Sequence, residues 1–266
     1  MVQQLVGGGT SLYLIPLLLL PILVLAFSKT ARSKAFSVVW LWSAEMKCDL
    51  ALASRKQQLV DDHRSKIKGK VLDVGTGGGA QLKYLAQVED VSEIVCVEPN
   101  TDFKKRLESR VSELLEERRR SGGKKLSIST FYGTVEEYFA APESSAAANT
   151  FDCVACLLVL CTVPDPAAIV TQLHDLCLRP SGTLLFVEHV APKDGTLLRS
   201  VFRYAQPCWN LCGDGCQLNR NTEETIRGAA DWEETISDPY VAKMLPIPIP
   251  WIFGVATKKA VVKRRR

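Results

Sequence analysis

An aspartate followed by a run of glycines is the feature of this sequence with the clearest chemical meaning. Asp73 precedes Gly75, Thr76, Gly77 and Gly79 in the stretch Val-Leu-Asp-Val-Gly-Thr-Gly-Gly-Gly. A strand that runs into such a turn brings backbone N–H groups, unobstructed by Cβ atoms, close to a nucleotide-like ligand. The carboxylate at the strand end can accept the ammonium of an amino-acid tail. This combination predicts a site for S-adenosylmethionine (SAM).

The same turn also fits a dinucleotide fingerprint, because Gly75, Gly77 and Ala80 have the spacing G-x-G-x-x-G/A. A dinucleotide site has no use for Asp73, whereas SAM carries no phosphate and has a charged methionine end. The acid therefore favours SAM. A glycine-rich loop without a ligand stays open as a third interpretation.

A second acid is placed where a ribose needs an acceptor. Ile94–Val97 is typical of a short buried strand, and Glu98 follows it, before Pro99 and Asn100. Glu98 comes 19 positions after Gly79, enough for one helix and a return strand. Strand ends gather at one edge of a parallel sheet, so we expect Glu98 beside the glycine turn, where it can accept both ribose hydroxyls. The alternative is a solvated glutamate in a loop.

These residues require a parallel sheet to position them, and the remaining pattern predicts one. Further strands are expected at 126–131, 151–160, 183–187 and 251–256, and helices at 45–66 and 168–178. The almost wholly apolar segment 151–160 is typical of a central parallel strand. Strand and helix alternating over about 190 residues predict a doubly wound α/β domain. The proline-rich run 246–251 is expected to form a stiff apolar lip.

Five stretches resemble class I SAM-dependent methyltransferases: VLDVGTGGG, VEPN, FDCVACLLVLCTV, LRPSGTLLFVEHV and DGCQLNR. Three motifs, LVLCTV, EHV and DGC-x-L-x-R, narrow the resemblance to the membrane-bound methyltransferase-like 7 family, whose members are microsomal thiol S-methyltransferases. The resemblance covers roughly residues 40–260. It implies a Rossmann-like seven-stranded sheet with an antiparallel final hairpin. It also implies that Asp73, Gly75, Gly77 and Glu98 hold SAM.

The resemblance extends the predicted SAM site to two further strand ends. It places Thr134 and Val135 after the third strand, near the adenine, and Cys156 and Leu157 at the fourth strand. Related enzymes often have an aspartate at the first of these positions, where Thr134 is a weaker acceptor. The family also usually has a cysteine in its glycine loop, where this chain has Thr76.

The acceptor is expected to be a small lipophilic thiol. A thiol with a free pKa of about 8.5 is a few per cent thiolate at neutral pH, so a modest base is enough. His189, just past the fifth strand, is the candidate base, and a histidine bonded to loop backbone is the alternative. Asp214 and Cys216 are second candidates, in the insertion 191–227; Asp214 could instead stabilise a turn. The side chains expected to line the acceptor pocket are Phe202, Tyr204 and Trp209.

Nine cysteines are present. Cys153, Cys156 and Cys161 lie in or next to the apolar segment 151–160 and are expected to be buried small hydrophobes. The C-x-x-C spacing of the first two resembles half of a zinc site, but no second half or histidine pair accompanies it. We therefore predict no metal site. The odd total also argues against a disulfide framework.

Residues 1–28 contain no charged side chain. Leu5 to Phe27 is 23 residues, about 34 Å as a helix, which is enough to cross a bilayer. A cleaved signal peptide is disfavoured, because no basic residue precedes the apolar core and no clear A-x-A site follows. Basic residues at 29–34 favour a cytosolic C-terminal side. Two prolines leave open a kinked span or a shallow hairpin in one leaflet.

The chain is thus divided into a membrane anchor at 1–30, a juxtamembrane and capping segment at 31–66, and a SAM-dependent methyltransferase domain at 67–266. The aromatic-rich patch 35–42 suits the lipid headgroup layer or packs on the domain. The formal net charge of +4 is modest, so membrane lipids rather than nucleic acid are the expected partners. The expected location is the endoplasmic reticulum membrane or lipid droplets, with the domain facing the cytosol. Alternatives are a lipid or quinone methyltransferase acting on oxygen or carbon, and a catalytically silent scaffold.

Overall fold

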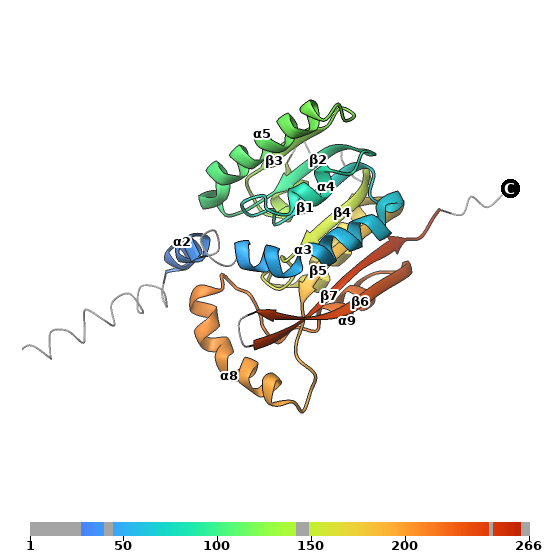
Figure 1. The fold of residues 1–266 in the computed structure, drawn as a ribbon. Helices are drawn as coiled ribbons and strands as arrows, with labels where there is room; N and C mark the ends of the chain where they lie inside the picture. The colour runs from blue at the N-terminus through green and yellow to red at the C-terminus, as the bar shows by residue number, and fades with distance from the viewer. Residues whose placement is uncertain (1–27, 40–44, 142–148, 245–246, 262–266) are drawn as a thin grey trace, which may run out of the picture.

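A single seven-stranded sheet organises the computed structural model, which describes residues 28–39, 45–141, 149–244 and 247–261 (Figure 1). The strand order is β3-β2-β1-β4-β5-β7-β6. Strands β1 to β5 are parallel, and β7 runs antiparallel between β5 and β6. The bounds are β1 Gly69–Val74, β2 Val91–Val97, β3 Ser127–Phe131, β4 Phe151–Leu157, β5 Leu178–His189, β6 Trp232–Met244 and β7 Ile247–Lys258. The predicted Rossmann-like seven-stranded sheet with an antiparallel final hairpin is confirmed.

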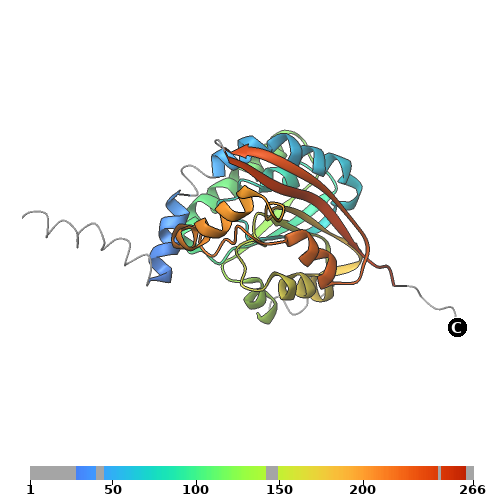
Figure 2. The same ribbon diagram turned by 90° about the horizontal axis from the view of Figure 1, so that it is seen from below.

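Helices cover both faces of this sheet, each over its own apolar cluster. One face carries α3 (Glu45–Asp62), α4 (Leu82–Ala86) and α5 (Lys104–Arg120). The other face carries α6 (Val135–Ala140), α7 (Pro166–Gln172) and α9 (Thr222–Ala229). Figure 2 shows the sheet between these two layers. Short turns of helix lie at η2 (Arg64–Lys66), η3 (Thr101–Phe103) and η5 (Leu173–Cys177).

The strand register decides which of the predicted site residues share a face. Asp73 lies opposite Cys96 of β2 and Ala155 of β4. Ala155 in turn lies opposite Leu185 of β5. Residues in register, and residues two apart on one strand, point to the same face of a sheet. Glu98, which follows β2, and His189, at the end of β5, therefore lie on the same face as Asp73. This face is the one that α3, α4 and α5 cover.

Two predicted elements differ from the structure. The helix expected at 168–178 is α7 followed by the wider turn η5, and β5 begins directly at Leu178. The lip expected at 246–251 is wrong for its described part, because Ile247 onward belongs to β7. Pro248 and Pro250 lie where β7 pairs with β6 beyond its last pair with β5, at Trp251. A strand position that pairs with a neighbouring strand on one side only tolerates a residue without an N–H donor.

The predicted anchor Leu5–Phe27 and positions 40–42 of the aromatic patch lie outside the described residues. The chain is described from Ser28, and α2 (Lys29–Val39) is its first described helix. A further helix, α8 (Leu197–Cys212), follows β5, and α2 packs against it. Among the helices of the described ranges, none has the combination of length and hydrophobicity needed to cross a membrane.

Candidate SAM and acceptor site

The glycine turn after β1 is built so that a ligand can approach its backbone at one point. Gly75, Gly77 and Gly79 have φ angles of 67°, 59° and 85°, a region that favours glycine. A Cβ at Gly75 would lie 2.3 Å from Cγ2 of Val159, so that position is closed by the loop after β4. A Cβ at Gly77 would meet nothing within 4 Å. The space for a nucleoside is therefore at Gly77.

Asp73 is a buried carboxylate with one unsatisfied oxygen. Its side chain is 1% exposed, and Oδ2 has no hydrogen-bond partner among the described atoms. Burial raises the pKa of Asp73 to about 7, opposed by a hydrogen bond with Thr76 and assisted by the charge of Glu98. A buried unpaired acceptor costs free energy, and an ammonium group beside it would remove that cost. The charged amino-acid end of SAM fits this position.

Glu98 lies beside the glycine turn, where strand order predicts it. Its Oε2 accepts a hydrogen bond from the Gly77 N–H at 2.7 Å, and its Oε1 accepts from the Asn100 N–H at 2.8 Å. Burial chiefly raises the pKa of this carboxyl, and the two backbone hydrogen bonds lower it in part. Each carboxylate oxygen keeps a further lone pair for a ribose hydroxyl. Pro99, the next residue, is exposed.

The hydroxyls of Thr134 and Thr76, both predicted to lie near SAM, form hydrogen bonds within the protein. The Thr134 hydroxyl accepts from the Glu137 N–H at 3.2 Å, and Oε2 of Glu137 accepts from the Thr134 N–H at 2.7 Å. This reciprocal pair is a capping box that begins α6, and it occupies the side chain predicted to meet the adenine. Val135 is buried in the apolar cluster of the opposite face from Asp73. In the glycine turn, the Thr76 hydroxyl donates to the backbone oxygen of Asp73 at 3.1 Å.

The two predicted residues of β4 point in opposite directions. Cys156 is fully buried in the apolar cluster on the face away from Asp73, so its thiol is part of the core. Leu157 is 6% exposed and belongs to the cluster on the Asp73 face. Only the second of these side chains therefore lies on the side where SAM would bind.

His189 and Cys216 meet at the acceptor end of the same face. Nε2 of His189 lies 3.1 Å from Sγ of Cys216, and both residues are buried. The imidazole packs edge-on against Trp251, with ring centroids 5.8 Å apart. Leu185 of β5 is in register with Asp73 two strands away, about 10 Å across the sheet, and His189 lies four residues, about 13 Å, farther along β5. The two residues are therefore about 16 Å apart, so a ligand that Asp73 holds would have to extend along this face to reach an acceptor beside His189.

The two groups shift each other's pKa. Burial would lower the pKa of His189, but the hydrogen bond and charge of Cys216 raise it overall. A hydrogen bond from Cys161 lowers the pKa of Cys216 to about 4, against burial, and His189 adds to the effect. Their contact thus favours the thiolate form of Cys216 and the protonated form of His189. The role of His189 as a general base stays a prediction.

Asp214 points away from this pair. Its Oδ2 accepts a hydrogen bond from the Ser33 hydroxyl of α2 at 3.2 Å, and its charge contributes to the raised pKa of Glu98. The φ of Asp214 is 44° and that of Gly215 is 88°, as in a tight turn. Asp214 thus has the backbone conformation of a turn residue, as the alternative prediction has it. Its side chain faces α2 and Glu98.

Cys161 is a functional candidate that sequence reasoning missed. Its Sγ, Nε2 or Nδ1 of His189 and Sγ of Cys216 all lie within 4.8 Å of one another. We call these three residues the Cys-His-Cys cluster. The prediction that Cys161 is merely a small buried hydrophobe is therefore incomplete: it is buried, but next to two reactive side chains. A sulfur inside an otherwise apolar motif, LVLCTV, was the available signal.

Glu188 holds the loop that carries Cys161. It is fully buried on the face opposite His189, and its Oε1 accepts from the N–H groups of Val159 and Leu160 at 2.8 and 2.7 Å. Burial raises the pKa of Glu188 to about 7. A charge-bearing residue at the end of an apolar strand is a sequence signal for such an anchoring role.

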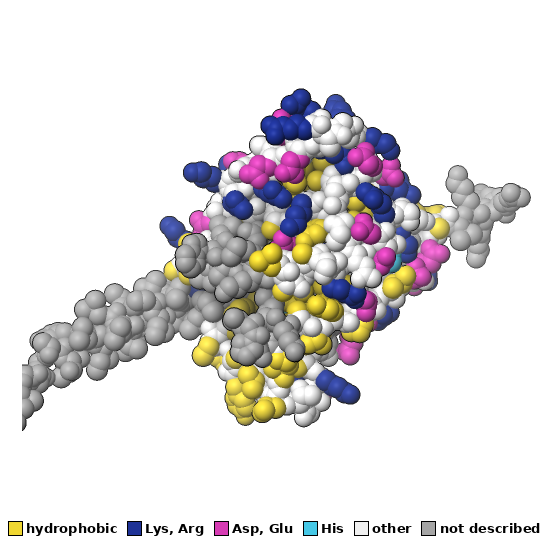
Figure 3. Space-filling model, in the orientation of Figure 1, with side chains coloured by type: hydrophobic (Ala, Val, Ile, Leu, Met, Phe, Trp, Pro, Cys, Tyr) yellow, Lys and Arg dark blue, Asp and Glu magenta, His cyan; other side chains and the backbone are white. Residues whose placement is uncertain are grey.

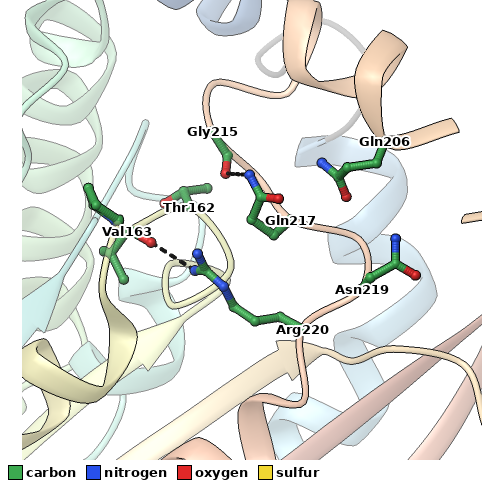
Figure 4. A pocket seen from close by; sticks show the side chains of 8 residues that line it. Thr162, Val163, Gln206, Gly215, Gln217, Asn219 and Arg220 are labelled. Carbon is green, nitrogen blue, oxygen red and sulfur yellow. Dashed lines mark hydrogen bonds between the residues drawn. The ribbon is translucent and has the colours of Figure 1, made fainter. Parts of the chain in front are cut away.

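A cavity of about 590 Å³ is lined by sequence neighbours of the cluster, although not by Cys161, His189 or Cys216 themselves. Its lining includes Thr162, which follows Cys161, and Gly215 and Gln217, which flank Cys216 (Figure 4). Amide and guanidinium side chains dominate the remainder: Gln206, Asn219 and Arg220. The aromatic side chains predicted to line the acceptor pocket do not line this cavity, and their role stays a prediction. Tyr204, for example, is 82% exposed on α8.

Helix α2 covers the loop that follows β2. Its Ser33 backbone oxygen accepts from Nδ2 of Asn100 at 3.4 Å, and Phe36 packs edge-on against Phe103 with centroids 6.4 Å apart. Together with the contact between Ser33 and Asp214, this places α2 over the rim of the SAM side. Helix α2 thus contacts residues next to Glu98, and the capping role of segment 31–66 stays a prediction.

Known proteins resemble this chain in sequence and in fold. The family model of the methyltransferase domain matches residues 45–230. Thiol S-methyltransferase TMT1B of Rattus norvegicus is 29% identical over 213 residues, covering 78% of this chain and 80% of the relative. TMT1B of Homo sapiens is 29% identical over 220 residues, covering 80% and 82%.

Solved structures share the fold at low identity. An O-methyltransferase family protein from Burkholderia thailandensis has a TM-score of 0.52 at 11% identity, covering 94% of this chain and 71% of its own. The arsenic(III) SAM methyltransferase CrArsM of Chlamydomonas reinhardtii has a TM-score of 0.51 at 18% identity, covering 72% and 64%. At these identities the likeness concerns the fold alone.

Proposed function

This chain belongs to the methyltransferase domain family, and from that premise we propose that it methylates the sulfur of small thiols. It is a SAM-dependent methyltransferase by family and by fold. The finer assignment concerns the acceptor. The observation that carries it is the Cys-His-Cys cluster, which brings two sulfurs and an imidazole together at the end of β5, on the face that Asp73 shares.

SAM supplies, when bound, a methyl group on positively charged sulfur, which departs as a neutral thioether. Asp73 would hold its ammonium and Glu98 its ribose hydroxyls, while the space at Gly77 admits the nucleoside. The chain's main contribution is alignment, because displacement needs donor and acceptor atoms in line and close together. Burial of both acids excludes water from the two ends of the ligand.

The relatives support a thiol as acceptor, since both TMT1B proteins are named thiol S-methyltransferases. A thiol needs only modest help to lose its proton, because its free pKa is about 8.5. The polar lining of the cavity supports acceptors that carry a hydrogen-bonding group. The expectation that the acceptor is lipophilic rests only on the proposed membrane association.

The test is methyl transfer from labelled SAM by the full-length protein, with a small aromatic thiol, a catechol and a quinol compared side by side. We expect the thiol to be methylated fastest, and Asp73→Asn to reduce all turnover. Faster methylation of oxygen or carbon would favour the quinone or lipid alternative. SAM binding by calorimetry with no turnover on any acceptor would favour the silent scaffold.

We also propose that the protein is bound to the endoplasmic reticulum membrane or to lipid droplets, with its catalytic domain facing the cytosol. The apolar, uncharged stretch before residue 29 supports this, and so does the exposed face of α8. Figure 3 shows hydrophobic side chains gathered over α8, which lies beside α2. The exposed large apolar side chains of this helix are Leu197, Val201, Tyr204 and Trp209. Apolar patches of this kind favour insertion into a lipid interface.

Carbonate extraction tests the membrane proposal. We expect the full chain to stay in the membrane pellet and a variant lacking residues 1–28 to be released more readily. Replacement of Tyr204 by Ser, on the exposed face of α8, should weaken the residual membrane binding of the shortened chain. Full release of the intact protein by carbonate would reject the anchor.

A further inference from the structure

Three side chains of types that bind metal ions converge at the end of β5, and they come from separate parts of the chain. Cys161 lies in the loop after β4, His189 ends β5, and Cys216 follows α8. Their ligand atoms lie within 4.8 Å of one another. All three residues are buried, with 4%, 8% and 7% of their surface exposed. Each comes from a different one of the motifs LVLCTV, EHV and DGC-x-L-x-R.

The separations fit a tetrahedral metal centre. Zinc binds Cys sulfur at about 2.3 Å and His nitrogen at about 2.0–2.1 Å, so tetrahedral ligand atoms lie about 3.5–3.8 Å apart. The 3.1 Å between Nε2 and Sγ of Cys216, and the 4.8 Å limit on the set, span that range. Side-chain rotations that move these atoms by up to about 1 Å would be enough to close the site.

We propose that Cys161, His189 and Cys216 bind a zinc ion, and that its fourth position receives the sulfur of the acceptor thiol. Two sulfurs and one imidazole form the ligand set used by catalytic zinc sites that keep an open position. The role of the fourth position rests on the proposed thiol methylation, whereas zinc binding itself does not.

Such a site would activate the acceptor thiol without a general base. Zinc binding would displace the proton of the Cys161 thiol and the proton that His189 and Cys216 share. An acceptor thiol then replaces a zinc-bound water and releases its own proton to solvent, so that it binds as a thiolate. Its sulfur lone pair forms the new bond to the methyl carbon, and the bond to the donor sulfur breaks with its electron pair remaining on that sulfur. The neutral thioether product binds zinc weakly, and water replaces it.

A disulfide between Cys161 and Cys216 is the competing use of the same sulfurs. It would need an oxidant and has no use for His189. The loop of Cys161 is held by Glu188, and the turn of Cys216 packs close to Thr162, with a Cβ on Gly215 reaching 3.0 Å from the Thr162 oxygen. Fixed ligand positions of this kind favour a metal site, because they hold the three side chains close together without a covalent bond.

Metal analysis of the full-length protein tests the proposal. After zinc loading and desalting, we expect one zinc per chain in the wild type. Cys161→Ala, His189→Gln and Cys216→Ala should each weaken zinc binding at least tenfold. Cys177→Ala is the matched control, because it also removes a buried thiol but is the last residue of η5, outside the cluster. SAM binding by calorimetry verifies that each variant is folded.

Cobalt substitution of the wild type tests the open position without any variant. Cobalt should produce thiolate charge-transfer absorption, and an added small thiol should change that spectrum. Substoichiometric zinc in the wild type, equal zinc in the cluster variants and the control, or a Cys161–Cys216 disulfide in reduced preparations would overturn the site. Thiol methylation by zinc-free protein would overturn its role while leaving the proposed function intact. A cobalt spectrum that no thiol changes would likewise overturn the acceptor role.

Discussion

Replacement of Asp73 by Asn should weaken SAM binding and remove most of its pH dependence. The pKa of Asp73 is raised to about 7, and SAM's ammonium requires the ionised carboxylate. The ionised fraction falls from about one half at pH 7 to about 3% at pH 5.5, so wild-type affinity should fall about 15-fold. Loss of the charge-assisted hydrogen bond is expected to cost about 1.5–3 kcal/mol at pH 7, or about 10- to 150-fold in affinity.

Isothermal titration calorimetry measures both effects. At pH 6.5 about three quarters of Asp73 is protonated, so wild-type binding should release about 0.75 proton, seen as a dependence of heat on buffer ionisation enthalpy. Asp73→Asn should release much less, with only Glu98 left to contribute. Equal affinity of the two proteins, or the same proton release in both, would refute the placement of the SAM ammonium at Asp73.

The same raised pKa has the opposite consequence for folding without SAM. The folded protein keeps the Asp73 proton up to about pH 7, whereas the unfolded chain loses it near 3.8. This group's contribution to the unfolding free energy therefore falls as pH rises from 4 to 7, by about 1.4 kcal/mol per pH unit. The neutral Asn avoids this loss. SAM-free Asp73→Asn should be more stable than wild type to urea at pH 8, with no advantage at pH 4.

Other substitutions separate the fold from the ligand site. Gly75→Ala should lower the unfolding free energy by about 1–3 kcal/mol through its clash with the loop after β4, measured in urea. Gly77→Ala, which points into open space, should retain more stability but bind SAM more weakly; the reverse order would contradict the proposed approach of the nucleoside. Glu98→Gln should weaken SAM binding about tenfold through loss of a charged acceptor, and unchanged calorimetric affinity would count against the ribose contact. Phe36→Ala should cost about 0.5–1.5 kcal/mol through the lost ring pair with Phe103 and speed proteolysis of α2; an unchanged cleavage rate would show that α2 does not depend on this contact.

The sheet was predictable because its signals are local and repeated. Apolar runs bounded by turn residues indicate strands, and alternation with helices restricts the connections to a parallel order. Asp73 lies near the end of β1 and Glu98 directly follows β2, so their meeting at one edge follows from topology alone. Their hydrogen bonds do not follow, because a carboxylate's partners depend on loop backbone that no periodic pattern specifies.

Two local signals in the sequence were given too little weight. Thr134 and Glu137 have the spacing of a capping box, which competes with the predicted ligand role of the Thr134 hydroxyl. The proline run at 246–251 suggested an isolated extended segment, yet it belongs to the stretch of β7 that extends past β5 and pairs with β6 alone. In both places, a correct local rule existed, but the neighbouring element decided which rule applied.

The Cys-His-Cys cluster shows where sequence reasoning reaches its limit. Because β4 and β5 are neighbours in a parallel sheet, the loop of Cys161 and the end of β5 must be close, and that half of the cluster was accessible from strand order. Cys216 comes 27 positions after His189, beyond an inserted helix whose return path no periodicity fixes. Its position depends on packing of α8 and the turn at Gly215 against Thr162. A prediction of no metal site made from C-x-x-C spacing is therefore blind to a centre assembled from three distant segments, and only the folded chain could suggest one.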